Sequence, residues 1–325
     1  MSEPSHSLKL VTWVLAGLAT LTLCGGGGSA AAAEKFLTRE VVMVVQFSPG
    51  GNTDVNARIL APYLQKELGV PVVVENRPEA GGVKAITDVY RAKPDGHTLL
   101  LNVFPQNAQK ELLFDVPFKI LEFTYLAGFT RSDMFVSVAK DSPIKTLKEL
   151  IETSKKKSLN VSVSQLGSSG HLNSMILKRR AGVNLEVVPY PGEAQAATAL
   201  LGGHVDLLSS TDTTVWLQRE RIRPLVVLSA KRTPRFPDVP TLKELGYDIV
   251  SDSQVGLSGP PGLPGGVQKN LSAALAKAIQ NPELASKLQA AGSVLHYAPG
   301  SEFQAAAKAA YNLVMEYKDI FQEKK

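Results

Sequence analysis

Residues 41–68 read VVMVVQFSPGGNTDVNARILAPYLQKEL, and this stretch indicates the fold class of the chain. The apolar run 41–45 is typical of a buried strand, and Gly69 marks the end of the helix that follows. That helix has a single apolar face, which consists of Ala57, Leu60, Ala61, Leu64 and Leu68. Similar apolar runs and helical patterns alternate along most of the 325 residues. The alternation predicts an α/β fold in which helices cover a mostly parallel sheet, and the length is sufficient for two α/β lobes.

The loop at residues 48–54, SPGGNTD, is rich in small residues that let backbone N–H groups approach a ligand closely. Residues 164–171, SQLGSSGH, form a second loop of this kind between an apolar run and a helical pattern. The first turn of a helix presents unpaired N–H groups and a partial positive charge, which together bind anions. Two such loops, far apart in the sequence, predict one ligand that carries an anionic group at each end.

The N-terminal segment has the pattern of a cleavable secretory signal at residues 1–33. Lys9 precedes an apolar run at residues 10–23, and small residues lead to a predicted cleavage site after Ala33. The alternative is lipid attachment at Cys24, although Leu23 is large where a lipoprotein signal has a small residue. Since Cys24 is the only cysteine, the mature chain would hold neither a disulfide nor a catalytic thiolate. The sequence thus predicts an extracytoplasmic protein.

Charge and missing motifs argue against several function classes. The net charge of +5 is modest and does not point to nucleic acid. The five histidines are scattered, and neither a His-Glu-x-x-His motif nor a nucleotide-binding glycine motif occurs. Ser169, His171 and Asp206 supply the residue types of a serine hydrolase, but the Gly-x-Ser-x-Gly elbow is missing from the sequence. We therefore predict no catalysis, no metal and no cofactor.

A series of short motifs runs through the whole chain. They are Pro49-Gly50-Gly51 with Asp54, Ala57 and Arg58; Glu75-Asn76-Arg77-Pro78 with Ala80-Gly81-Gly82; Lys93-Pro94-Asp95-Gly96; Gly167-Ser168-Ser169-Gly170-His171; Val188-Pro189-Tyr190; Leu201-Gly202-Gly203-His204-Val205-Asp206; and Pro237-Asp238-Val239-Pro240-Thr241. In number, order and spacing this series resembles the Bug-type solute receptors of tripartite tricarboxylate transporters. The resemblance covers essentially the whole mature chain.

The resemblance implies a two-lobed periplasmic binding protein of type II-like fold, with a ligand cleft between the lobes. It implies one discontinuous lobe at residues 34–138 and 253–325, and a second lobe at residues 139–252. The expected ligand is a small di- or tricarboxylate, acidic amino acid or aromatic carboxylate, and the expected partners are the permease subunits of the transporter. We expect a monomer that binds no nucleic acid. The alternatives are a ligand-sensing partner of a membrane histidine kinase and, more remotely, a serine-type hydrolase.

The residues predicted to bind the ligand lie in the two loops and just after the strands that follow. They are Phe47, Ser48, Gly50, Gly51, Asn52, Thr53, Gly167, Ser168, Ser169, His171, Tyr190, Gly192 and Asp212. Backbone N–H groups of both loops are expected to hold carboxylates, and Phe47 resembles the aromatic wall of the family's site. The structural alternatives are tight turns for the glycines, helix capping for the serines and Asp212, core packing for Phe47, and a backbone hydrogen bond for His171.

Three charged residues near the loops carry further expectations. Glu193 stands in a loop that departs from the family pattern, and its carboxylate is expected to face the cleft, where it would repel a third ligand carboxylate or attract an amine. Asp54 would repel an anionic ligand, so its expected role is to cap the helix or hold the loop. Because backbone N–H groups can hold carboxylates, no essential arginine–carboxylate pair is predicted, and Arg58 is the residue that tests this.

Overall fold

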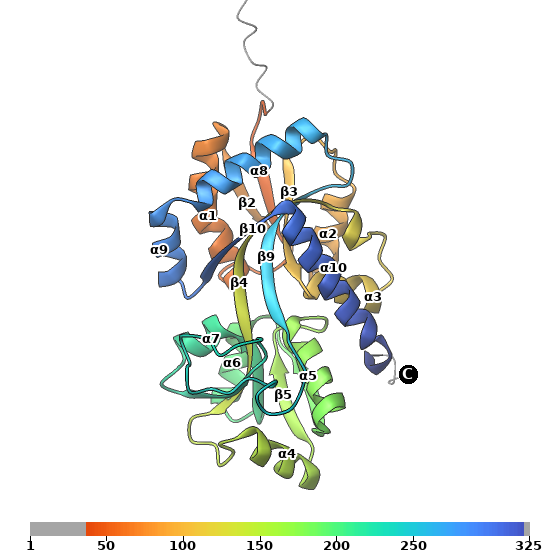
Figure 1. Ribbon diagram of the computed structural model, residues 1–325. Coiled ribbons are helices and arrows are strands. Elements are labelled where there is room, and N and C mark those ends of the chain that lie inside the picture. Colours follow the sequence, from red (N-terminus) through yellow and green to blue (C-terminus); the bar gives the residue numbers. More distant parts are fainter. Residues whose placement is uncertain (1–36, 322–325) are drawn as a thin grey trace, which may run out of the picture. The chain divides into compact units, whose positions relative to one another are not determined.

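The computed structural model describes residues 37–321 (Figure 1), and the predicted signal peptide at residues 1–33, with Cys24, lies outside the described residues. The strands are β1 (Val41–Val45), β2 (Val72–Asn76), β3 (Thr98–Phe104), β4 (Thr124–Ala139), β5 (Leu159–Val163), β6 (Leu185–Pro189), β7 (Leu207–Thr211), β8 (Ile222–Val227), β9 (Asp252–Gly259) and β10 (Val294–Pro299). The helices are α1 (Asn52–Leu68), α2 (Val83–Tyr90), α3 (Gln106–Leu113), α4 (Leu147–Lys156), α5 (Ser169–Ala181), α6 (Glu193–Leu201), α7 (Asp212–Leu217), α8 (Gly265–Ile279), α9 (Pro282–Ala290) and α10 (Gly300–Glu316). Short 3-10 turns are η1 (Glu79–Gly82), η2 (Ile120–Glu122) and η3 (Lys318–Phe321).

The β1–α1 segment folds as its sequence predicts. Strand β1 pairs in parallel with β2 on one side and with β3 on the other. Helix α1 buries its predicted apolar face, which is formed by Ala57, Leu60, Ala61, Leu64 and Leu68. The helix ends at Gly69, whose φ of 68° is the left-handed conformation that favours glycine. The predicted strand and helix are therefore confirmed.

The strands form one sheet in the order β2-β1-β3-β9-β4-β7-β5-β6, in which β8 and β10 also pair with β4. Strand β4 is 16 residues long and runs through both halves of this sheet (Figure 1). Its residues 124–133 pair with β9 and β10, whereas its residues 134–139 pair with β7 and β8. We call the part with β1–β3, β9, β10 and residues 124–133 region 1, and the part with β5–β8 and residues 134–139 region 2.

Each region contains a parallel set of strands extended by antiparallel ones. In region 1 the parallel set is β2-β1-β3, and β9 joins β3 to β4 in antiparallel orientation. In region 2 the parallel set is β6-β5-β7, and β7 pairs antiparallel with β4. The fold is therefore mixed α/β, and the loops that follow β1, β5, β6 and β7 leave the sheet at carboxyl ends of parallel strands, where such folds bind ligands.

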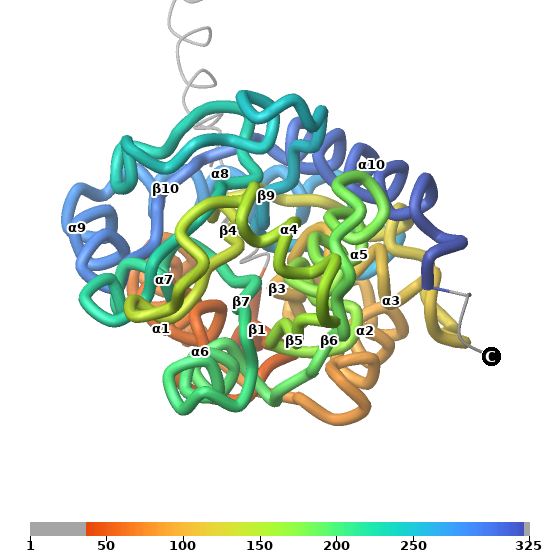
Figure 2. Tube along the Cα trace, turned by 90° about the horizontal axis from the view of Figure 1, so that it is seen from below, coloured from red at the N-terminus to blue at the C-terminus, as the bar shows by residue number. Residues whose placement is uncertain are grey.

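Helices that follow region 2 in the sequence return to region 1. Helix α8 packs against α1 and β4, and α10 packs against β4 and α3. In region 2, α5 and α6 flank β5 and β7, while α7 packs on β4. Figures 1 and 2 both place α6 and α7 on the side of the molecule where α1 lies, and α5 on the side of α3 and α10.

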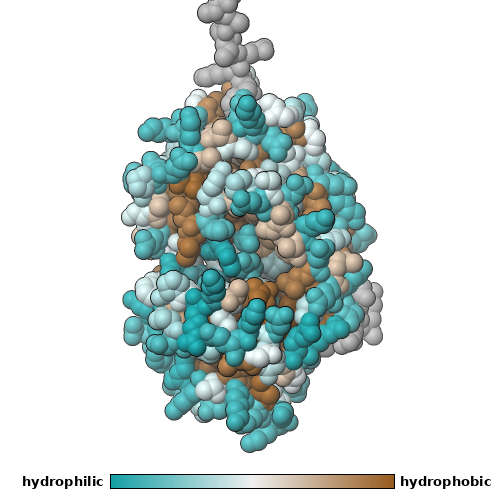
Figure 3. Space-filling model, in the orientation of Figure 1, coloured by the Kyte–Doolittle hydropathy of each residue, from teal (hydrophilic) through white to brown (hydrophobic). Residues whose placement is uncertain are grey.

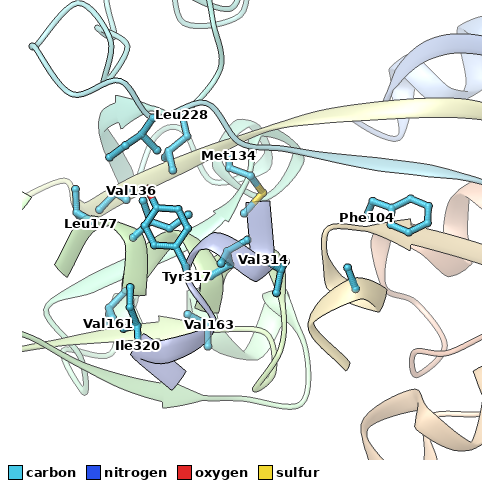
Figure 4. Close-up of a cluster of buried hydrophobic side chains, with 14 of the residues drawn as sticks. Phe104, Met134, Val136, Val161, Val163, Leu177, Leu228, Val314, Tyr317 and Ile320 are labelled. Atoms are coloured by element: carbon cyan, nitrogen blue, oxygen red, sulfur yellow. The ribbon is translucent and has the colours of Figure 1, made fainter. Parts of the chain in front are cut away.

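One cluster of buried apolar side chains continues from region 1 into region 2 (Figure 4). Phe104 lies at its region 1 side, and Val161 and Val163 of β5 lie at its region 2 side. The chain after α10 adds Tyr317 and Ile320, which are buried in the same cluster. The C-terminal segment therefore packs against both regions, and the burial of its apolar side chains stabilises their arrangement.

The face of the molecule drawn in Figure 3 is mainly hydrophilic, with separate hydrophobic patches between the polar residues. Exposed large apolar side chains include Phe114, Leu166 and Leu217. Within residues 37–321, no helix is both long enough and apolar enough to cross a membrane.

Candidate functional site

A cavity of about 660 Å³ is lined by residues of both regions. Region 1 contributes residues 47–53, Val55, Val103, Gln106, Ser253, Val255 and Ala291. Region 2 contributes residues 164–165, 169–170, 191–195, 197–198, 201–202, 211, 213–214, 217–218 and 221. This volume falls within the range of about 300–1,000 Å³ that is usual for small-molecule sites. The cavity is therefore the place where the predicted ligand residues must be sought.

The loop after β1 presents backbone N–H groups to this cavity. Helix α1 begins with Gly51 as its N-cap, and no side chain caps its first turn. The first-turn N–H groups therefore remain open to an anion, and Asn52 and Thr53 line the cavity. Gly50 differs, because its N–H donates to Asp54 Oδ2 at 2.8 Å and its φ of +84° is a glycine conformation. Gly50 thus shapes the loop, although it also lines the cavity.

A polar network around the buried Asp54 holds this loop from the α1 side. Asp54 Oδ2 accepts from Gly50 N and from Arg58 Nε, while Asp54 Oδ1 accepts from Asn76 Nδ2 at 2.9 Å. Asn76 Nδ2 also donates to Phe47 O at 3.0 Å. Burial acts to raise the pKa of Asp54, but hydrogen bonds from Arg58, Gly50 and Asn76 outweigh it and leave that pKa below its usual range. Asp54 therefore holds the loop as a carboxylate, and Arg58 is occupied in the same network.

Phe47 and Ser48 stand at the start of the loop. Phe47 is half-buried and lines the cavity, and Ser48 is exposed and lines it as well. The side chain of Asn52 is less free, since its Oδ1 accepts from Ser293 Oγ at 2.9 Å. Phe47 thus forms part of the wall, and Asn52 can offer its backbone N–H more readily than its side-chain oxygen.

The loop after β5 uses its polar groups internally. Ser168 is the N-cap of α5, and its Oγ accepts from His171 N at 3.2 Å. The N–H of Gly167 donates to His171 Nδ1 at 3.0 Å, and Gln109 Nε2 of α3 donates to Ser168 O at 2.9 Å. Burial lowers the pKa of His171 to about 4, so its ring is neutral and can accept this bond. Gly167, Ser168 and His171 do not line the cavity and build the loop instead.

Ser169 and Gly170 are the residues of this loop that do line the cavity. Ser169 Oγ is buried and has no hydrogen-bond partner among the described residues. Gly170 lies so close to β7 that a Cβ at this position would stand 2.4 Å from Ser209 O. Gly170 therefore allows α5 to begin tightly against β7, and this places the free hydroxyl of Ser169 at the cavity.

Two glutamines that the sequence does not single out also have a buried, unpaired polar atom at the cavity. Gln106 Nε2 and Gln165 Oε1 are buried without a partner in the described part of the chain, and both residues line the cavity. An unpaired buried polar group costs roughly 1–3 kcal/mol, so a ligand that pairs with it gains stabilisation. Together with Ser169, these residues give the cavity three unsatisfied polar side chains. Gln106 directly follows Phe104-Pro105 at the end of β3, and this position after a strand was its only signal in the sequence.

The segment after β6 lines the cavity only in part. Tyr190 is outside the lining, where it packs against the apolar side chains under α6, whereas Gly192, the N-cap of α6, belongs to the lining. Glu193 also lines the cavity, and its carboxylate accepts from Thr211 Oγ1 at 2.6 Å and from Thr214 Oγ1. These bonds hold a negative charge in the wall between α6 and α7.

Asp212 lies behind the lining and is 1% exposed. Its Oδ2 pairs with Arg235 Nη1 at 3.1 Å. Burial raises the pKa of Asp212 to about 7, against the lowering effect of Arg235. Arg235 also donates to Gly292 O, and Thr213 Oγ1 donates to the same oxygen at 2.8 Å. Asp212 thus orients a contact between region 2 and the turn before β10. Within residues 37–321, no group of three or more acidic, histidine or cysteine side chains could hold a metal ion.

A family model described as the tripartite tricarboxylate transporter family receptor matches residues 56–324. The chain belongs to this receptor family. Protein BugT of Bordetella pertussis is 31% identical over 291 residues, which cover 87% of this chain and 89% of BugT. MatC of Rhodopseudomonas palustris with bound malate superposes with a TM-score of 0.78 at 28% identity, covering 87% of this chain and 99% of MatC. Rpa4515 of R. palustris with adipate superposes with a TM-score of 0.79 at 28% identity, covering 88% of this chain and 98% of Rpa4515.

Members of the tripartite tricarboxylate transporter receptor family are periplasmic solute-binding proteins, not enzymes. The structural neighbours show the same fold with ligands bound, so the resemblance found in the motifs is confirmed and the chain is a solute-binding receptor of the two-lobed α/β class. In this receptor the cavity takes its walls from region 1 and region 2.

Proposed function

We propose that this receptor binds a small organic dicarboxylate between region 1 and region 2 and delivers it to the permease subunits of a tripartite tricarboxylate transporter. The observation that carries the proposal is that the uncapped first turn of α1 and the unpaired hydroxyl of Ser169 line the same cavity. One ligand carboxylate accepts from the N–H groups of Asn52 and Thr53. The other accepts from Ser169 and from Gln106. The ligands named for MatC and Rpa4515, malate and adipate, are dicarboxylates and support this class.

In this proposal region 1 forms the centre of a lobe at residues 34–138 and 253–325, and region 2 forms the centre of a lobe at residues 139–252. Residues 134–138 of the first lobe continue along β4 and pair with β7 and β8 of the second. A ligand that touches both regions stabilises the closed arrangement by its differential affinity for that arrangement. The contacts from Gln109 to Ser168 and from Arg235 to Gly292 join the same regions beside the cavity. Export by a signal peptide at residues 1–33, with cleavage after Ala33, brings the receptor to the periplasm as a monomer.

Glu193 defines what the site disfavours. Its carboxylate is fixed in the cavity wall by Thr211 and Thr214, so a third ligand carboxylate near it meets a like charge. We therefore propose dicarboxylates as better ligands than citrate-like tricarboxylates, with acidic amino acids accepted where their amine faces Glu193.

The test is calorimetric titration of the chain from Glu34, unfolded and refolded first to remove carried-over ligand. The panel contains C4 to C6 dicarboxylates, citrate, glutamate, terephthalate and a neutral sugar. We expect at least one dicarboxylate to bind with a Kd in the range of about 1 μM or below, where about 8 kcal/mol of binding free energy is available. Binding of the sugar alone, or of no carboxylate in the panel, would contradict the proposal.

A further inference from the structure

The cavity extends well beyond the two loops, along one face of α6. The lining residues of this helix are Glu193, Ala194, Gln195, Ala197, Thr198 and Leu201. Of these, Ala194, Ala197, Thr198 and Leu201 follow the spacing of a single helical face. Helix α6 starts at the carboxyl end of β6 and runs away from the loops. At 1.5 Å per residue, the path from Glu193 to Leu201 is about 12 Å long. The cavity therefore has an extension on the region 2 side, in which apolar side chains such as Ala197 and Leu201 lie beside polar ones.

The opposite wall of this extension has the same spacing. From α7 and the turn after it, the cavity is lined by Thr213, Thr214, Leu217, Gln218 and Arg221, and the last four follow this spacing. Helices α6 and α7 contact each other, so the two faces form one groove. Leu217 is 59% exposed, which is unusual for a leucine packed in a core, and the groove is thus open to an apolar group.

Arg221 is the only cationic residue in the lining of the cavity, all of which lies within residues 37–321. Its guanidinium forms no hydrogen bond and no ion pair with any described residue, although guanidinium groups are well suited to bidentate binding of carboxylates. The neighbouring arginines are engaged: Arg219 lies 4.6 Å from the Trp216 ring centroid, and Arg223 donates to Ser142 O at 3.2 Å. Arg221 is thus an exposed cation in the lining of the α6–α7 groove, with no side-chain partner among the described residues.

The volume of the cavity exceeds what a short ligand fills. A C4 to C6 dicarboxylate has about ten non-hydrogen atoms, which at roughly 30 Å³ for each, the share of a water molecule in the liquid, take less than half of the space. The cavity measures about 660 Å³. Glu193 and Arg221 both line this cavity, so an anionic tail is repelled by the carboxylate and attracted by the guanidinium.

We infer that the receptor takes dicarboxylates with a long apolar spacer, whose second carboxylate binds Arg221 while the spacer lies in the α6–α7 groove. This inference rests on the proposed carboxylate binding at the loop after β1. It makes Arg221 a determinant of ligand length. For long ligands, it replaces the prediction that no arginine–carboxylate pair is needed. For short ligands, that prediction stands.

The test is calorimetric titration with saturated dicarboxylates of four, six, eight and ten carbons and with the matching monocarboxylates. The proteins are the wild type, Arg221→Gln and the control Arg219→Gln, since Arg219 is next to the groove and outside its lining. We expect Arg221→Gln to weaken the eight- and ten-carbon dicarboxylates by about 10- to 100-fold, because it removes a charge-assisted bond. The four-carbon dicarboxylate and the monocarboxylates should change by less than about twofold, as should every ligand of Arg219→Gln.

A second variant checks the groove itself. Leu217→Asp adds a negative charge at an exposed position, so the fold is kept and the long dicarboxylates should again weaken selectively. Equal affinities of wild type and Arg221→Gln for every ligand, or an equal loss at every length, would overturn the inference. Short dicarboxylates that still bind in that case would leave the proposed function standing. If no dicarboxylate binds the wild type, the proposed function and this inference both fail.

Discussion

The loops after β1 and after β5 look alike in sequence and differ in how they use their donors. In the first, no side chain caps α1, and the buried Asp54 holds the loop from below. In the second, the Ser168 hydroxyl caps α5 and the His171 ring takes the Gly167 N–H. The first loop therefore keeps open backbone donors, whereas the second contributes the hydroxyl of Ser169. A small-residue strand-to-helix loop thus indicates a site, but the capping pattern decides which atoms can reach a ligand.

The largest expected effect is at the open backbone donors. Gly51→Val should weaken dicarboxylate binding by at least about 100-fold, because the added side chain blocks the approach to the first-turn N–H groups of α1. A Cβ at Gly51 would meet only Ser48 O at 3.6 Å, so the folded state has room for it. Calorimetry and thermal unfolding measure the two effects separately. The control is Gly266→Val, also near a helix start and with open space around it. Normal affinity in Gly51→Val would show that the first loop is only a turn.

The next effect tests what holds the first loop. Asp54→Asn removes the charge that pairs with Arg58, and we expect unfolding by urea to show a loss of about 1–3 kcal/mol with a clear loss of affinity. Since the folded pKa of Asp54 is lowered, its contribution is present above the unfolded pKa and is lost as the pH falls through the folded value. The stability difference between wild type and Asp54→Asn should therefore shrink at acidic pH. A difference that stays constant down to acidic pH would contradict this role.

The neighbouring residues Ser168 and Ser169 allow helix capping and ligand binding by a hydroxyl to be tested separately. Ser169→Ala should weaken dicarboxylate binding by about 3- to 10-fold and leave the melting temperature nearly unchanged, because its hydroxyl bonds to no described residue. Ser168→Ala should do the reverse and cost about 0.5–2 kcal/mol of stability through the lost N-cap. If Ser168→Ala weakens binding more than Ser169→Ala, the assignment of the two serines is wrong.

The smallest effect concerns the pH dependence of the second loop. The pKa of His171 is lowered to about 4 in the folded state, so His171 favours folding above its usual pKa of 6.5 and loses this contribution as the pH falls toward 4. Asp212, with a pKa raised to about 7, has the opposite slope between its usual 3.8 and that value. We therefore expect the melting temperature of His171→Gln to fall less than that of the wild type between about pH 6.5 and pH 4. Identical pH profiles of the two proteins would show that His171 is not buried in its neutral form.

Much of the fold could be predicted because local patterns determine it. The apolar face of α1 and the glycine at its end are both sequence signals, and the structure confirms them. Local patterns do not predict strands β9 and β10. β9 carries Gly256, at which a Cβ would stand 2.4 Å from Ala127 O, so its glycine serves a close contact with β4 that no local pattern reveals. Long-range antiparallel pairing of this kind depends on tertiary structure more than on propensity.

The candidate site could be predicted where a loop follows a parallel strand. Residues 47–53 and Ser169 lie at the cavity, as the patterns after β1 and β5 indicate. His171 and Asp212 were selected for their chemistry, yet their partners, Gly167 N–H and Arg235, occupy them inside the fold. Gln106, Gln165 and Arg221 reach the cavity from separate elements, so only the folded chain brings them together.

The central claim is that one ligand carboxylate binds at α1 and the other at Ser169. The most direct test is a double-mutant cycle that combines one change in the ligand with one substitution in the protein. Adipate and its monomethyl ester are titrated into the wild type and into Ser169→Ala. If one carboxylate binds at α1 and the other at Ser169, the ester should bind more weakly than adipate, and Ser169→Ala should weaken adipate while adding little loss for the ester. Losses that simply add, or an ester that binds as tightly as adipate, would contradict a site with one carboxylate at the start of α1 and the other at Ser169.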